Sequence, residues 1–281
     1  MIESLFSPKV ARQKPWVVFF AATVFTLISI LLVFQVVSPG QNGAGMGLLL
    51  VSFITIAATP LFLTLFKIEE EEEKKVEKEG LLSELFKRHA DIIKVLGFFF
   101  IAIIFTSSIF SVLMPKTSAI VFADQTNDLL SRGIISARAT NGINFFEILF
   151  NNLKVLVLIF IFSFVFGAGA IFVLSWNATV IGTLIAKIAE NPAQYGFITI
   201  AEGNSLANYI IALPYTLLRL LPHGLFEFFA YFIAAVAGGI LSVAIIREKL
   251  LTEKEIIFKD ICCYMAIAAI FIFIGAAIES I

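Results

Sequence analysis

The sequence has little charge for its length. Only 15% of its 281 residues are Asp, Glu, Lys or Arg, whereas soluble domains carry about 25%. Of the 41 charged residues, 16 lie between residues 67 and 94, so the rest of the chain is poorer still. This composition excludes a soluble globular enzyme and a disordered protein. A formal net charge of −1 leaves no basic surface for phosphates, so we expect no nucleic-acid partner.

Residues that carry out chemistry are also scarce. The chain has two His and two Cys residues, and Cys262 and Cys263 are adjacent, so they suit neither a disulfide nor a zinc site. We expect His89, next to Arg88, at the surface. No H-E-x-x-H, G-x-S-x-G, Walker or dinucleotide-binding motif is present. We therefore predict no catalytic residue, metal, cofactor or nucleotide, and we do not expect an enzyme.

Long apolar runs are what the sequence has in abundance. Hydrophobic residues make up 59% of it, including 31 Phe, and its mean hydropathy is +0.98. A helix needs about 20 apolar residues to cross a bilayer. The run 17–37 is too long for a signal-peptide core and ends in a Ser-Pro-Gly turn, so we predict that it is the first span. The fold class predicted is an all-α polytopic helix bundle embedded in the lipids of the cell membrane.

Seven crossings are predicted in all, and two of them are irregular. The uncharged segment 155–186 is too long for one straight span and too short for two spans with a turn. We expect a break at residues 175–177, where Ser175 or Asn177 caps a second, shorter helix. The fifth segment, 206–221, contains Pro214 and is short or broken. The remaining spans are predicted at residues 46–66, 95–114, 225–246 and 261–277.

The distribution of Lys and Arg predicts the orientation, because cytoplasmic loops carry an excess of both. With a cytoplasmic N-terminus and seven crossings, 15 of the 20 basic residues fall inside and five outside. Six crossings, without the fifth, would move the last four basic residues outside. We therefore predict a cytoplasmic N-terminus and a C-terminus outside.

One charged stretch divides the chain. A two-span leader (1–66) precedes a cytoplasmic arm (67–94), and a five-span body (95–281) follows. The arm has five consecutive Glu residues ahead of three Lys residues. This pattern predicts a solvated helix that spaces two spans, and a docking arm for a partner is the alternative. The outer loop 115–150 is long enough for a short helix and marks no site.

Ionisable residues within apolar spans are costly, so each one is a candidate for function. His223 and Glu227 lie four residues apart on one helix face, Arg219 lies just before them, and Glu279 lies near the end of the last span. We predict that Arg219, His223, Glu227 and Glu279 form a membrane polar cluster that relays protons, binds an ion or seals a cavity. The alternative is structural, with the His223–Glu227 pair only locking the packing of helices.

Amides and small residues accompany these charges. Asn side chains can bond backbone groups that an interrupted helix leaves free, and small residues let helices approach closely. Proline suits the first turn of a helix. The candidate helix-break and packing residues are Asn151, Asn152, Gly167, Gly169, Asn177, Gly182, Pro222, Gly224, Gly238 and Gly239.

The second half contains four short motifs: Asn151-Asn152-Leu153-Lys154-Val155, Gly167-x-Gly169 leading to Asn177-x-x-x-x-Gly182, Leu221-Pro222-His223-Gly224-x-x-Glu227, and Ile278-Glu279. With them, residues 95–281 resemble the stage II sporulation protein M family, especially its archaeal branch. The resemblance implies five spans and a membrane core that organises partners. In spore-forming bacteria such proteins are scaffolds for peptidoglycan hydrolases. The leader and the charged arm lie outside the resemblance.

Two functions follow as hypotheses. The first is a non-catalytic membrane scaffold or assembly factor that self-associates or binds other membrane proteins. It draws on the resemblance, the small-residue faces and the missing catalytic motifs. The second is a transporter or channel for a small solute or ion. It draws on the irregular fourth and fifth segments and on the His223–Glu227 pair, while the lack of a convincing inverted repeat weighs against it.

Overall fold

The computed structural model describes residues 8–36, 43–73, 89–131, 144–166, 169–196, 198–246 and 254–280. Within these ranges every regular element is a helix, and seven helices are long and apolar enough to cross a membrane. The predicted all-α polytopic bundle is therefore confirmed. The seven helices are α3 (Trp16–Val36), α4 (Met46–Glu73), α6 (Ala90–Leu113), α9 (Phe145–Phe166), α10 (Ala170–Glu190), α11 (Ser205–Ile246) and α12 (Lys254–Glu279).

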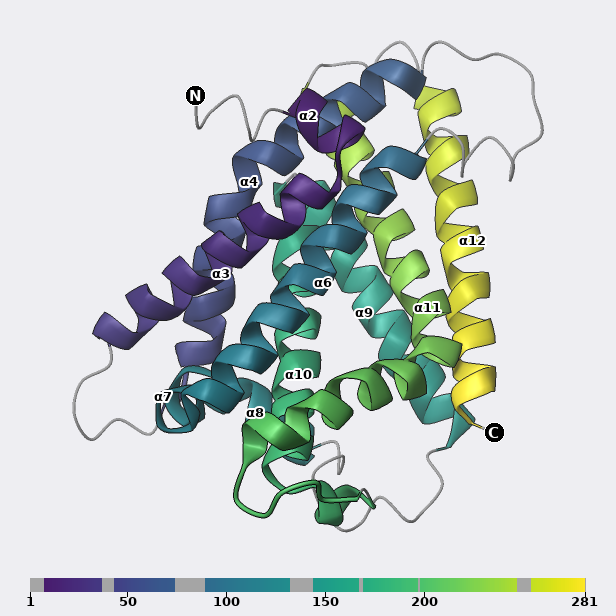
Figure 1. Cartoon of the computed structure of the whole chain (residues 1–281). Coiled ribbons are helices and arrows are strands. Elements are labelled where there is room, and N and C mark those ends of the chain that lie inside the picture. Colours follow the sequence, from purple (N-terminus) through teal and green to yellow (C-terminus); the bar gives the residue numbers. More distant parts are fainter. Residues whose placement is uncertain are drawn as a thin grey trace.

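Short helices lie at both ends of the bundle. Figure 1 shows α2 (Pro8–Gln13) at the upper end and the close of α12 at the lower end. The predicted helix in the outer loop is present as two, α7 (Pro115–Val121) and α8 (Ala123–Ser131), and a 3₁₀ turn, η1 (Pro192–Tyr195), follows α10. The first and last helices therefore reach opposite ends of the bundle, as an odd number of crossings requires.

The predicted break at residues 175–177 is wrong. Ser175 and Asn177 lie inside α10, and the chain is divided earlier, where α9 ends at Phe166. Two membrane-length helices fit because α9 begins at Phe145, ten residues ahead of the uncharged segment. Its first turns therefore carry polar residues that the sequence alone assigned to a loop.

The α9 and α10 helices form a hairpin. The rings of Phe162 and Phe172 stack with their centroids 6.3 Å apart, whereas ten residues of one straight helix span about 15 Å. At the turn, a Cβ atom on Gly169 would collide with the carbonyl oxygen of Phe162. Glycine thus permits the close approach of the two helices. Its neighbour Gly167 lies outside the described residues.

The segments predicted as a fifth and a sixth span form one helix. α11 runs for 42 residues and contains both Pro214 and Pro222, so Pro222 lies in a helix interior rather than in a first turn. A proline removes a backbone hydrogen bond and bends the helix. In Figure 1 the first part of α11 runs obliquely across the lower end of the bundle, and the second part rises beside α12. The number of crossings is still seven. The α9–α10 hairpin replaces one predicted span with two, and α11 replaces two predicted spans with one.

The second part of α11 forms the centre of the bundle, and residues 230–244 are all buried. Gly238 lies against α9, where a Cβ atom would be 2.7 Å from the carbonyl oxygen of Phe160. Gly239 lies against α4, where a Cβ atom would be 2.7 Å from the ring of Phe66. The Ser163 hydroxyl of α9 donates a 2.9 Å hydrogen bond to the α11 backbone. The small-residue faces therefore serve contacts within this chain.

The leader is attached to the body by a helix cap from a distant part of the sequence. The Asp124 carboxylate of α8 accepts hydrogen bonds from the backbone N–H groups of Gly45 (3.0 Å), Gly47 (2.9 Å) and Leu48 (3.3 Å) at the start of α4. A carboxylate at a helix N-terminus accepts hydrogen bonds from N–H groups that have no partner within the helix. Its negative charge also interacts favourably with the helix dipole. The α4 helix continues past the predicted leader boundary to Glu73, and residues 74–88 of the predicted arm lie outside the described residues.

We expect Gly238→Ala to lower the free energy of unfolding by about 1–3 kcal/mol, because the added methyl group overpacks the α9–α11 contact. Thermal unfolding in detergent measures the loss. Gly97→Ala in α6 is the matched control, since the nearest atom to its Cβ would be 3.9 Å away, and this change should not destabilise the protein. Equal unfolding temperatures for the two variants would contradict the packing described above.

Candidate functional site

A cavity of about 370 Å³ opens between α9, α10, α11 and α12, at the end of the bundle where α12 finishes. Its lining combines apolar and polar side chains. The apolar residues are Leu129, Ile148, Val155, Val180, Ile181, Leu184, Leu220 and Phe228. The polar residues are Glu147, Asn151, Asn152, Asn177, His223, Glu227, Tyr231 and Glu279. Half of the lining residues are thus polar, in a bundle whose other helix contacts are mostly apolar.

The inner part of the cavity is a hydrogen-bonded network centred on Asn152. Its Nδ2 group donates to Oε1 of Glu227 at 2.5 Å, and its Oδ1 atom accepts from the Tyr231 hydroxyl at 3.2 Å. All three residues are buried: Glu227 is 9% exposed, Asn152 is 7% exposed and Tyr231 is 3% exposed. An amide donor on one carboxylate oxygen offsets part of the cost of burying Glu227. The second oxygen of Glu227 has no hydrogen-bond partner among the described residues.

The outer part of the cavity carries two further carboxylates. Glu147 lies in the first turn of α9 and Glu279 at the end of α12, and both residues are exposed. Both line the same cavity as buried Glu227. Carboxylates therefore lie at two depths, two at the mouth and one inside.

A glycine makes room for the buried carboxylate. A Cβ atom on Gly275 of α12 would be 2.9 Å from Cγ and 3.4 Å from Oε1 of Glu227, and 3.2 Å from the carbonyl oxygen of His223. Any side chain at this position would compete with Glu227 for the same space. The α12 helix is thus close to α11 at the level of the cavity.

Three of the four residues in the predicted polar cluster meet in this cavity. His223, Glu227 and Glu279 all line it, whereas Arg219 is exposed and is not part of the lining. Arg219 therefore supplies no positive charge to the cavity, so the predicted four-residue cluster is wrong in this one member. In a straight helix, its spacing of four from His223 would give both residues the same face, but Pro222 lies between them, and a proline bends the helix.

The residues predicted for helix breaks and packing separate into two groups. Asn151, Asn152 and Asn177 line the cavity. The glycines lie elsewhere: a Cβ atom on Gly182 would collide with Ser107 of α6, and Gly224 is buried inside α11. These glycines form helix contacts and contribute no atom to the cavity lining.

Two lining residues escape the sequence analysis. Glu147 falls in a segment assigned to the outer loop, and Tyr231 reads as an ordinary aromatic residue of an apolar span. A helical spacing of four would have found both, since Glu147 precedes Asn151 by four residues and Tyr231 follows Glu227 by four. The spacing of four between Glu147 and Asn151 is informative only if α9 is known to begin as early as Phe145.

The electrostatics of the cavity favour positive charge. Three carboxylates line it, and none of its lining residues is Lys or Arg. In a low-dielectric surrounding, the field of such carboxylates is screened far less than in water. Within the described part of the chain, no group of three or more His, Cys, Asp or Glu side chains is arranged to hold a metal ion.

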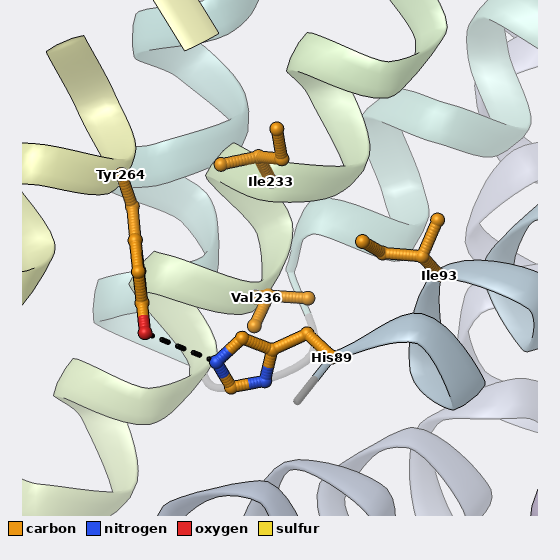
Figure 2. A pocket seen from close by; sticks show the side chains of 5 residues that line it. All are labelled: His89, Ile93, Ile233, Val236 and Tyr264. Atoms are coloured by element: carbon orange, nitrogen blue, oxygen red, sulfur yellow. Dashed lines mark hydrogen bonds between the residues drawn. The ribbon is translucent and has the colours of Figure 1, made fainter. Parts of the chain in front are cut away.

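A second, much smaller site surrounds His89 at the opposite end. His89 is 1% exposed, so the expected surface position is wrong. Figure 2 shows its ring and the Tyr264 side chain of α12 pointing toward each other, with Nε2 of His89 and the Tyr264 hydroxyl 3.1 Å apart. Ile93, Ile233 and Val236 surround the pair and leave no water-sized space. This contact packs the start of α6 against α11 and α12 and offers no room for a ligand.

We expect Tyr264→Phe to lower the free energy of unfolding by about 1–3 kcal/mol, because it leaves a buried ring nitrogen of His89 without this partner. The same change in a His89→Phe background should have a smaller effect, since the interaction is already absent there. Chemical or thermal unfolding of the four proteins in the cycle measures the coupling. Strictly additive effects would show that the two side chains do not interact.

Comparisons with known proteins place this geometry in a family context. The sequence model described as "Stage II sporulation protein M" matches residues 95–281, about two thirds of the chain. An uncharacterized protein of Methanocaldococcus jannaschii is 36% identical over 142 residues, which cover 48% of this chain and 68% of that protein. No solved structure matches. The family match includes all four helices around the cavity and excludes α3 and α4.

Proposed function

The chain belongs to the stage II sporulation protein M family, and we propose that it acts in the cell membrane as a non-catalytic transporter or channel for a small solute or ion. The polar cavity carries this proposal. A carboxylate as deep as Glu227 is expensive in a membrane bundle. If Glu227 only locked helix packing, neighbouring side chains would fill the space around it. Instead about 370 Å³ is open beside it, which is within the range of small-ligand sites.

The shape of α11 supports the same proposal. Glu227 follows Pro222 by five residues, where α11 changes from its oblique first part to its buried second part. Transporters commonly bind substrate where membrane helices are interrupted or bent, because such helices present polar groups at depth. On α11 the cavity lining reaches Tyr231 and includes none of the buried residues 232–244 beyond it. The arrangement therefore corresponds to access from one side of the membrane.

We further propose that this side is the outside. With the seven helices as described, a cytoplasmic N-terminus places 14 of the 20 Lys and Arg residues inside. Lys187 moves to the outer side relative to the sequence-based count, because the α9–α10 hairpin precedes it. The excess of inside charge persists. The C-terminus and the cavity mouth at Glu279 are then outside.

We expect Glu227→Gln to reduce flux through reconstituted protein at least tenfold, because the amide removes the buried ionisable carboxyl group and retains the side-chain volume. Proteoliposomes assayed with sodium, potassium, protons and small amines measure the flux. Glu202→Gln is the matched control, an exposed residue on the same end of the bundle that does not line the cavity. Its flux should equal that of the unmodified protein.

Two outcomes would contradict transport. One is the absence of flux for every solute in this panel from protein that unfolds cooperatively. The other is a measurable flux that both Glu227→Gln and Glu202→Gln leave unchanged. Thermal unfolding of each variant in detergent excludes misfolding as the cause of a lost flux.

A scaffold or assembly factor is the second candidate function, and the resemblance to the family's scaffolds favours it. The α4 helix continues beyond its apolar part through five consecutive Glu residues at positions 69–73. Such an extension offers a helical segment to a basic partner on the cytoplasmic side. The small-residue faces no longer support this function, because Gly238 and Gly239 are occupied within the chain.

We expect a scaffold to co-purify with a membrane protein in fixed stoichiometry, and replacement of Glu69–Glu73 by Gln to release that partner. Native mass spectrometry after gentle extraction from the source membrane measures the complex. The Glu227→Gln protein is the control, since its cavity change should leave the complex intact. Recovery of the chain alone, or a complex that is insensitive to the Glu69–Glu73 change, would count against this interface.

A further inference from the structure

We propose that the cavity binds an organic cation, a primary ammonium or guanidinium group on a short apolar chain, with Glu227 as its anchor. This inference rests on the proposed function for the cavity being a ligand site and adds the chemical class of the ligand. It is carried by the sign of the charge in the cavity, by the kind of hydrogen-bonding groups left open there, and by the available volume.

The charge of the cavity selects a cation. Glu147 and Glu279 lie at the mouth and Glu227 inside, while no lining residue is Lys or Arg and Arg219 is exposed elsewhere. An anion would meet three carboxylates without a fixed counter-charge. A cation that passes the two outer carboxylates reaches a third that is nine-tenths buried, since Glu227 is 9% exposed. Attraction therefore increases in an increasingly dry surrounding.

The cavity offers open hydrogen-bond acceptors to a cationic ligand. Nδ2 of Asn177 donates to the carbonyl oxygen of Val173 at 2.8 Å, and Nδ2 of Asn151 donates to Asn152 at 3.4 Å. Both side chains line the cavity, so each offers a ligand its carbonyl oxygen as an acceptor beside its second N–H group. Asn152 and Tyr231 are engaged with each other and with Glu227. The second oxygen of Glu227 is unpartnered within the described residues, which makes it the natural acceptor for a ligand N–H group.

Volume and spacing favour an organic ion over a bare metal ion. No three acidic, His or Cys groups in the described part of the chain are close enough to chelate a metal, and Mg²⁺ and Ca²⁺ need about six or more oxygen ligands. About 370 Å³ is far more than a dehydrated ion requires. Val155, Val180 and Ile181 form an apolar wall, and the Phe228 ring adds a face that can attract a cation. An ammonium group with a short hydrocarbon chain uses all of these features.

Equilibrium binding of n-butylammonium chloride to the purified full-length chain tests the proposal. Isothermal titration calorimetry should give saturable binding, and 1-butanol, the neutral analogue, should give none. Glu227→Gln should weaken butylammonium binding at least tenfold. Glu279→Gln, at the exposed mouth, should weaken it about threefold, and it keeps the test decisive if the buried variant does not fold. Glu202→Gln should bind like the unmodified chain.

The outcomes separate this inference from the transport proposal. Saturable amine binding without any flux upholds the ligand class and overturns transport. Flux of another solute by a chain that does not bind butylammonium overturns the ligand class alone. Amine binding that neither Glu227→Gln nor Glu279→Gln weakens, or Glu227-dependent binding of CaCl₂ that exceeds butylammonium binding, also overturns the assignment.

Discussion

The need to satisfy one buried carboxyl group organises the half of this bundle that contains the cavity. Glu227 lies on the central helix and is only 9% exposed, so it has lost most of the water that would solvate it. Asn152 supplies a donor, so α9 must begin early enough to carry this amide at the right depth. Gly275 leaves the space that the carboxylate occupies. The early start of α9, the register of α11 and the close approach of α12 all follow from that requirement.

The two halves of α11 differ in what they do for the molecule. The first half is oblique and presents exposed apolar residues such as Ile210 and Leu218 at the lower end of the bundle. The second half is buried throughout residues 230–244 and contacts its neighbours through Gly238 and Gly239. Glu227 lies between the oblique first half of α11 and the buried run of residues 230–244. The bundle is thus open on the side of the mouth and closed by tight glycine contacts beyond it.

Hydropathy predicts the fold class and the number of crossings, because both depend on summed apolar length. It assigns the boundaries of α9 and α10 wrongly, since it treats Glu147, Asn151 and Asn152 as too polar for a span. They are tolerated there because they line a polar cavity formed with α10, α11 and α12, and this depends on the tertiary structure. For the same reason the spacing of His223 and Glu227 predicts a shared face but not the exclusion of Arg219. The burial of His89 depends on Tyr264, 175 residues later, and no local pattern signals it.

The cap that Asp124 places on α4 has a consequence for biosynthesis. The N–H groups of Gly45, Gly47 and Leu48 enter the membrane region well before their acceptor exists, since Asp124 follows Gly45 by 79 residues. At roughly 5–20 residues per second, a ribosome needs about 4–16 s to make that stretch. During this interval the first two spans are inserted while the start of α4 relies on water or lipid headgroups for its hydrogen bonds. Final docking of the leader therefore waits for α8 to be made, which couples the order of synthesis to the order of assembly.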